Sequence, residues 1–247
     1  ILVEYQEADK YVILNEDVDL HPIHIKLPEP PPLDEIDGFG LPAHKQKFKR
    51  AQMPAKLKRL VDSCDTVEEI WESLAAEQGE YHEEIEWIET QWYYRIHGYW
   101  CWINGKPTYI DGWHYTYINF WKFDDGSSPE YRDRNRKFYH GLRYAYKASD
   151  KPETDTLGRP IYEDKEKRII KMFDTGLRVF NGITYPKHRR DGATNMCACA
   201  MYCEVTIRYG VGAGIVSMTG EHARTKIFNE IVVPGWQQMP FFFKPIY

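Results

Sequence analysis

The feature that most constrains the fold is the order of the segments between residues 177 and 233. The sequence predicts a strand at residues 177–185, a glycine-containing turn at residues 187–195 and a helix at residues 194–209. A second strand at residues 212–219 and a second helix at residues 221–233 follow. Gly210 closes the first helix, and Pro234 is expected to stop the second. Strand and helix alternating in this way predict an α/β fold with a parallel sheet and right-handed crossovers.

The turn between the first strand and the first helix has the sequence KHRRDGATN. When the phosphate-loop pattern G-x-x-x-x-G-K-[ST] is aligned on Gly192, Ala193 takes the lysine position and Thr194 the hydroxyl position. The first glycine position falls on Lys187, so the turn carries its lysine at the other end. An ammonium on a long flexible stem can reach phosphate oxygens from either end of such a loop.

Other residues of the turn also suit a bound phosphate with Mg²⁺. Thr194 would place its hydroxyl on Mg²⁺, while the helix N-terminus and the loop amides hold phosphates. Arg189 and Arg190 add planar guanidinium groups suited to the charge of phosphoryl transfer. The alternative is a basic surface turn, and Asp191 counts against anion binding unless its side chain points away. The candidate nucleotide-binding residues here are Lys187, His188, Arg189, Arg190, Asp191, Gly192, Ala193, Thr194 and Asn195.

Breaks in composition divide the chain into three predicted segments. Residues 1–53, with the proline tract LPEPPPLDE, read as an extended arm or linker in which VILNEDVD is an edge strand or part of the arm. Residues 54–150 read as a helical and aromatic hairpin subdomain, and residues 151–247 as the first part of the α/β domain.

Local signals are strongest in the middle segment. Thr66 and Glu69 have capping-box spacing, and Asn104-Gly105 between aromatic and β-branched residues predicts a hairpin. A helix is expected from Trp113, and another around RDRNRKFYHGLRYAYKA. An apolar helix face is predicted at every third or fourth residue, namely Tyr81, Ile85, Ile88, Trp92 and Ile96.

Composition excludes several classes of protein. A net charge of −5 argues against a surface built mainly to coat nucleic acid, although it allows a local basic patch. No run of residues is long and apolar enough for a membrane span, and the first residues do not form a signal peptide. A start at Ile1 indicates a piece of a longer protein, and five cysteines without disulfide spacing fit a reducing cytoplasm.

The turn KHRRDGATN resembles the variant Walker A motif of the large terminase subunits of tailed bacteriophages, in which a lysine often leads the motif and Ser or Thr closes it. The block GYWCWINGKPTYIDGWHYTYINFWKFDDGSSPEYRDRNRKFY is similar to terminases of Bacteroidetes-infecting and crAss-like phages. The resemblance covers about residues 65–247, and the two blocks in this order are more specific than either alone.

The resemblance implies a P-loop motor ATPase that packages double-stranded DNA into procapsids in the host cytoplasm, with ATP and Mg²⁺ as cofactors. Lys187 would be the phosphate-loop lysine, Thr194 the magnesium residue, and Arg189 or Arg190 a γ-phosphate sensor. Trp113 or Tyr115 would contact adenine. The implied partners are the portal protein, the small terminase subunit and further copies of the chain in a ring, with no membrane.

The chain departs from this family downstream of the turn. A Walker B strand, which ends in Asp-Glu, is missing after Thr194, because Glu204, Glu221 and Glu230 do not follow apolar runs. The clustered carboxylates of the terminase nuclease domain are also missing. We therefore expect the chain to bind nucleotide without turning it over. The alternatives are a related P-loop helicase or translocase and a non-catalytic interaction module.

Further groups of residues in the chain have both a structural and a functional explanation. Cys197, Cys199 and Cys203 are better explained as small residues where the helix packs tightly against a sheet than as metal ligands. The basic residues 44–59 are better explained as a solvated helix face than as a DNA clamp, and His222 and Arg224 as an exposed first helical turn. Core packing is expected to account for most of the aromatic block at residues 99–123.

Overall fold

A computed structural model describes residues 5–6, 11–13, 24–26, 30–149, 192–208 and 210–244. The chain divides into two compact units, of which the first comprises Ile1–Pro31 and Arg132–Asp191 and the second comprises Pro32–Tyr131 and Gly192–Tyr247. The predicted strand at 177–185 and residues 187–191 of the predicted loop lie outside the described residues. The three segments predicted from composition remain a prediction.

The described elements of the first unit are three short strands and a helix. The strands β1 (Tyr5–Gln6), β2 (Tyr11–Ile13) and β3 (His24–Lys26) pair antiparallel in that order, and α5 spans Asp133–Ser149. β2 includes only Val12 and Ile13 of VILNEDVD, and it has a partner on each side, so these two residues do not belong to an edge strand as predicted. The rest of VILNEDVD lies outside the described residues.

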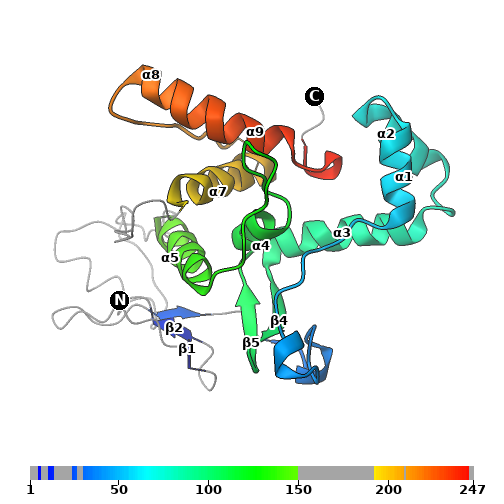
Figure 1. Cartoon of the computed structure of the whole chain (residues 1–247), viewed down its shortest axis with the longest axis horizontal. Coiled ribbons are helices and arrows are strands. Elements are labelled where there is room, and N and C mark those ends of the chain that lie inside the picture. The colour runs from blue at the N-terminus through cyan, green and yellow to red at the C-terminus, as the bar shows by residue number, and fades with distance from the viewer. Residues whose placement is uncertain are drawn as a thin grey trace, which may run out of the picture. The chain divides into compact units, whose positions relative to one another are not determined.

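The second unit is mainly helical (Figure 1). Its elements are η1 (Leu33–Glu35), η2 (Ala43–Lys45), α1 (Ala55–Ser63), α2 (Val67–Ala76), α3 (His82–His97), β4 (Tyr99–Ile103), β5 (Lys106–Ile110), α4 (Gly112–Asn119), α7 (Ala193–Ile207), α8 (Gly220–His222), η3 (Ala223–Val232), α9 (Val233–Gln237) and η4 (Phe241–Phe243). No helix in the described part of the chain has both the length and the apolar character needed to cross a membrane.

The cap, the hairpin and the two helices predicted around residues 113 and 132–148 are confirmed. The Thr66 side chain accepts a hydrogen bond from the amide of Glu69 at 3.2 Å and caps α2. β4 and β5 form an antiparallel hairpin in which Ile103 pairs with Lys106, and Asn104 and Gly105 have φ values of 51° and 82°. These positive φ values are the backbone that the two-residue turn requires, which explains the Asn-Gly sequence. The helices predicted from Trp113 and around residues 132–148 correspond to α4 and α5.

The buried face of α3 differs from the predicted apolar face. The buried residues of α3 are Glu84, Ile88, Gln91 and Arg95, whereas Ile96 is 39% exposed. Polar side chains can occupy a helix interface when partners satisfy them. Gln91 accepts a hydrogen bond from the Tyr115 hydroxyl at 2.6 Å. Apolar periodicity therefore identified only part of this face, since Ile88 is buried as predicted.

An aromatic core joins the C-terminal residues to the helical region. The three phenylalanines of η4 pack edge-on against Trp71, Trp87 and Trp92, with ring centroids 5.1 to 5.5 Å apart. The Trp92 indole also donates a hydrogen bond to the Phe242 carbonyl at 2.9 Å. Most aromatic residues of the block at 99–123 are buried as well, which confirms that core packing accounts for them.

The described sheets are antiparallel, and no parallel phosphate-loop sheet is present in the described residues. Residues 212–219, predicted as a strand, form no strand, and Val216 and Met218 are 94% and 88% exposed. A strand needs a neighbouring strand to bond its backbone, and no described residue pairs with this segment. The observed architecture is therefore a mixed helix and strand fold.

The last predicted helix is present but does not end at Pro234. α8, η3 and α9 follow one another directly, η3 is a π-helix, and Pro234 lies in the first turn of α9. The helical segment therefore continues through this proline, which removes one backbone hydrogen-bond donor where η3 meets α9. Figure 1 shows α7 between α4 and this helical rod, and α7 contacts both. The tight packing of α7 is thus against helices in the described structure, rather than against the predicted sheet.

Candidate functional site

The C-terminal end of the predicted phosphate loop is a sharp entry into α7. Gly192 has φ 74° and ψ 15°, and its carbonyl accepts the hydrogen bond from the Met196 amide at 3.1 Å. The helix begins at Ala193, as predicted within one residue, and has no side-chain cap. Thr194 is exposed in the first turn, where backbone amides have no partner within the helix. This end of the turn can accept a ligand that supplies hydrogen-bond acceptors.

The first turn of α7 is held in place by a buried tryptophan. The Trp121 indole donates a hydrogen bond to the Asn195 Oδ1 atom at 3.2 Å, and Trp121 is fully buried. Gly235 of α9 lies against the same indole so closely that an added Cβ would be 2.2 Å from it. Trp121 therefore fixes the position of Asn195, one residue after Thr194, and Gly235 packs against Trp121 in turn.

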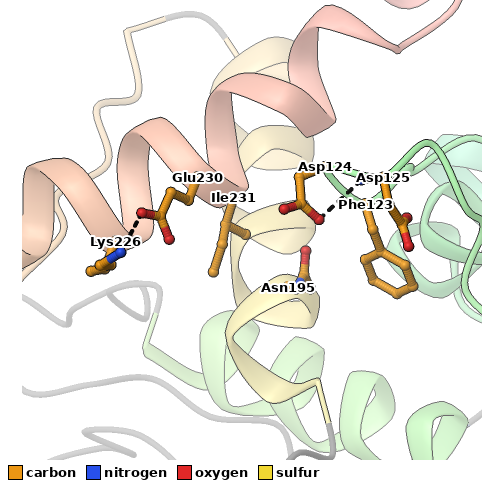
Figure 2. Close-up of a pocket in the computed structure, with 7 residues that line it drawn as sticks. All are labelled: Phe123, Asp124, Asp125, Asn195, Lys226, Glu230 and Ile231. Atoms are coloured by element: carbon orange, nitrogen blue, oxygen red, sulfur yellow. Dashed lines mark hydrogen bonds and ion pairs between the residues drawn. The ribbon is translucent and has the colours of Figure 1, made fainter.

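A pocket of about 310 Å³ opens beside this turn (Figure 2). Residues 123–125 line one side, Asn195 lies at its centre, and Lys226, Glu230 and Ile231 of η3 line the other side. Lys226 forms an ion pair with Glu230 at 2.6 Å. The remaining carboxylates, from Asp124 and Asp125, make the pocket acidic, so it suits hydroxyl or amino groups better than phosphates.

Hydrogen bonds keep one of these carboxylates ionised. The Ser127 hydroxyl and amide both donate to the Asp125 carboxylate, at 2.6 and 2.9 Å, and hold its pKa below the ordinary value. The sequence analysis did not identify this loop as part of a site. The turn signal Asp124-Asp125-Gly126 was present, but only the tertiary structure brings it next to α7.

No group of three or more His, Cys, Asp or Glu residues in the described structure is arranged to hold a metal ion. This finding does not bear on Thr194, because Mg²⁺ at a phosphate site is typically held by one or two side chains together with phosphates and water. Cys199 and Cys203 are buried in the interface of α7, whereas Cys197 is exposed.

The two predicted adenine-contacting residues are buried. Trp113 is 2% exposed and donates from its indole to the Glu204 Oε1 atom at 3.0 Å, and Tyr115 is 4% exposed. Desolvation of the Tyr115 hydroxyl raises its pKa, and the Tyr94 hydroxyl contributes to the same shift. Adenine stacking by Trp113 or Tyr115 stays a prediction, and it would require these rings to be uncovered.

A buried arginine joins α3 to α7, and the sequence analysis missed it. Arg95 is fully buried, and its guanidinium carbon lies 4.5, 4.9 and 5.3 Å from the ring centroids of Phe243, Trp92 and Tyr202. Its Nη2 donates to the Thr206 hydroxyl, while Nε and Nη1 have no hydrogen-bond partner in the described part of the chain. Three aromatic faces thus provide most of the stabilisation of this cation.

The same arginine acts on a cysteine of α7. Burial raises the pKa of the Cys203 thiol, but hydrogen bonds with Cys199 and Thr116 and the positive charge of Arg95 lower it to about 7. The thiol is fully buried, so this ionisation couples to packing rather than to chemistry at the surface.

His222 and Arg224 lie where α8 passes into η3. The His222 Nδ1 atom lies 2.7 Å from the Ser217 hydroxyl, its amide bonds to Thr219, and Arg224 is exposed at the start of η3. Arg224 is exposed, as the sequence favoured, whereas His222 is half-buried. Comparisons of the chain with protein-family models, with curated proteins and with solved structures gave no match.

Proposed function

We propose that this chain is the ATP-binding part of a large terminase subunit, the motor ATPase that packages double-stranded DNA into procapsids of tailed phages. The proposal rests on the lysine-led turn, in which Lys187 precedes Gly192 and Thr194 by the spacing of a phosphate loop. The geometry at Gly192 supports it, because a left-handed glycine followed directly by a helix is what a phosphate-binding turn needs.

Each group of the turn has a distinct role in this proposal. The Lys187 ammonium would neutralise the β- and γ-phosphates, and the Thr194 hydroxyl would be a ligand of the Mg²⁺ that accompanies them. Arg189 or Arg190 stabilises charge on the γ-phosphate. The amides at the start of α7 complete the cradle, and Thr194 is exposed as such a contact requires.

The neighbouring pocket suits the nucleoside of the same ligand. Phe123 and Ile231 offer apolar surface, and the Asp124 and Asp125 carboxylates accept hydrogen bonds from hydroxyl or amino groups. Its acidic lining disfavours phosphates, which keeps the triphosphate on the turn. In packaging, the subunit would act as a ring of copies with the portal protein and the small terminase subunit.

Titration calorimetry with Mg-ATP tests this proposal. Wild-type protein should bind, and Lys187→Ala should weaken binding by at least tenfold because it removes a charge-assisted contact to the phosphates. Lys106→Ala, at an exposed lysine of β5, is the matched control and should bind as the wild type does.

A second variant tests the metal. Thr194→Val removes the hydroxyl but keeps the side-chain shape, and it should reduce the gain in affinity that Mg²⁺ gives. Equal binding by wild type and Lys187→Ala would remove Lys187 from the site. Absence of binding by the wild-type chain would contradict the proposal for this chain.

A further inference from the structure

Residues 44–59, which we call the basic strap, are the most positively charged stretch of the described chain. They contain seven lysines and arginines and no aspartate or glutamate, in a chain whose net charge is −5. A block of like charge inside an acidic protein indicates a surface for a polyanion when its charges are free to reach one.

The basic strap is not the single solvated helix face that its sequence favoured. Its first residues belong to the short 3-10 helix η2, and an irregular stretch follows. The α-helical part begins only at Ala55, the first residue of α1. Figure 1 shows this stretch running from the short helices beside the β4–β5 hairpin to α1. An irregular stretch holds its position only where other contacts fix it.

Uncharged groups anchor the strap to the second unit. The Gln46 Oε1 atom accepts a hydrogen bond from the Gly105 amide at 2.6 Å, and the Ala51 amide donates to the Asn119 Oδ1 atom at 2.8 Å. The Phe48 ring stacks on Tyr131 with centroids 5.8 Å apart. These contacts fix the irregular stretch without using its lysines.

The lysines alternate with these anchors and face solvent. Lys45, Lys47 and Lys49 are exposed, whereas Gln46 is buried and Phe48 half-buried. No described residue forms an ion pair with any of the three lysines. An alternating arrangement of this kind presents a row of free ammonium groups on one anchored segment.

The helical end of the strap adds two more free charges. Lys58 and Arg59 of α1 are exposed and have no ion-pair partner in the described structure. Lys56 is different, because it pairs with Glu80 at 3.2 Å and lies 4.3 Å from the centre of the Tyr81 ring. Asp62, on the same helix, is the nearest carboxylate in sequence and is not within ion-pair distance of either charge.

We propose that the five free charges of the basic strap contact the phosphate backbone of double-stranded DNA. The choice of DNA as the polyanion rests on the proposed function, whereas the surface itself is defined by charge and exposure. Four of the five charges are lysine ammoniums, which act as point charges without the planar fork of arginine, so the contact is expected to depend on phosphates and not on base sequence. Its affinity must therefore fall steeply with salt.

Fluorescence anisotropy of a labelled 30-base-pair duplex, titrated with the full chain over a range of salt concentrations without ATP, tests this surface. Wild-type protein should bind at low salt. The triple variant Lys45→Gln, Lys47→Gln and Lys49→Gln should bind at least tenfold more weakly and reduce the slope of log K against log salt by about 2.7, since each phosphate contact contributes about 0.9.

A matched pair of single substitutions controls for net charge. Lys47→Gln should reduce the slope by about 0.9, whereas Arg224→Gln, at an exposed arginine of η3, should leave it unchanged. Equal binding and an unchanged slope in the triple variant would refute the proposal, as would failure of the wild-type chain to bind duplex DNA at low salt.

Binding of single-stranded RNA but not duplex DNA would refute the choice of DNA. Because the assay contains no ATP, it can succeed while calorimetry fails, or fail while calorimetry succeeds. The two proposals are therefore tested separately.

Discussion

The close contact between α3 and α4 gives the sharpest test of the packing. Gly112 is the first residue of α4 and follows the N-cap Asp111. A Cβ added at Gly112 would lie 2.1 Å from the Arg95 carbonyl oxygen and 2.7 Å from its carbon. These are backbone atoms of a helix, so the overlap can be relieved only by moving α3 and α4 apart.

Gly220 provides a matched control. It is also the first residue of a helix after a capping residue, Thr219, but an added Cβ there would meet no atom within 4 Å. Replacing glycine by alanine inside a helix stabilises it by about 0.5 to 1 kcal/mol, and the gain is smaller at a first helical position such as these. Overpacking typically costs about 1 to 3 kcal/mol, and at Gly112 the obstructing atoms cannot rotate away.

We therefore expect opposite signs for the two substitutions. Gly112→Ala should lower the free energy of unfolding by about 2 kcal/mol, and Gly220→Ala should leave it unchanged or raise it by about 0.5 kcal/mol. Urea denaturation followed by circular dichroism measures both, with the midpoint compared at constant slope. A midpoint for Gly112→Ala at or above the wild-type value would refute the α3–α4 contact.

Two further predictions concern the interfaces around α7. The pKa of Cys203 is about 7 when folded and 9.0 in the free thiol, so its contribution to stability is present above pH 9 and lost as the pH falls through 7. Wild-type protein should thus gain up to about 2 kcal/mol more stability between pH 7 and pH 9 than Cys203→Ala does, and parallel pH profiles in urea denaturation would contradict the Arg95 contact. Gly235→Ala would place a Cβ 2.2 Å from the Trp121 ring. The substitution should lower the free energy of unfolding by about 1 to 3 kcal/mol. A thermal midpoint equal to that of the wild type would contradict the close contact between Gly235 and the Trp121 ring.

The sequence predicted the features that depend on neighbouring residues. Positive φ at Asn104 and Gly105, and the cap of α2 by Thr66, follow from the backbone preferences of those residues themselves. The start of α7 after Gly192 was predicted for the same reason. This is the part of the candidate site that local sequence can determine, because a glycine-led turn into a helix needs no distant partner.

The predictions that failed depended on distant residues. Residues 212–219 have the composition of a strand, yet no described segment pairs with them. The buried face of α3 contains Gln91 and Arg95 as well as the predicted Ile88, because the Tyr115 hydroxyl bonds to Gln91 and aromatic rings of other elements pack on the Arg95 guanidinium. Side-chain periodicity carries no information about partners of this kind.

By itself, the sequence determined the hairpin turn, the cap of α2 and the start of α7 after Gly192, since each depends on the conformational preferences of residues close in the chain. Only the tertiary structure decided that Asn195 shares a pocket with residues 123–125 and η3, and that Arg95 lies among three aromatic rings. These groups are far apart along the chain, and packing of the helices is what brings them within contact distance.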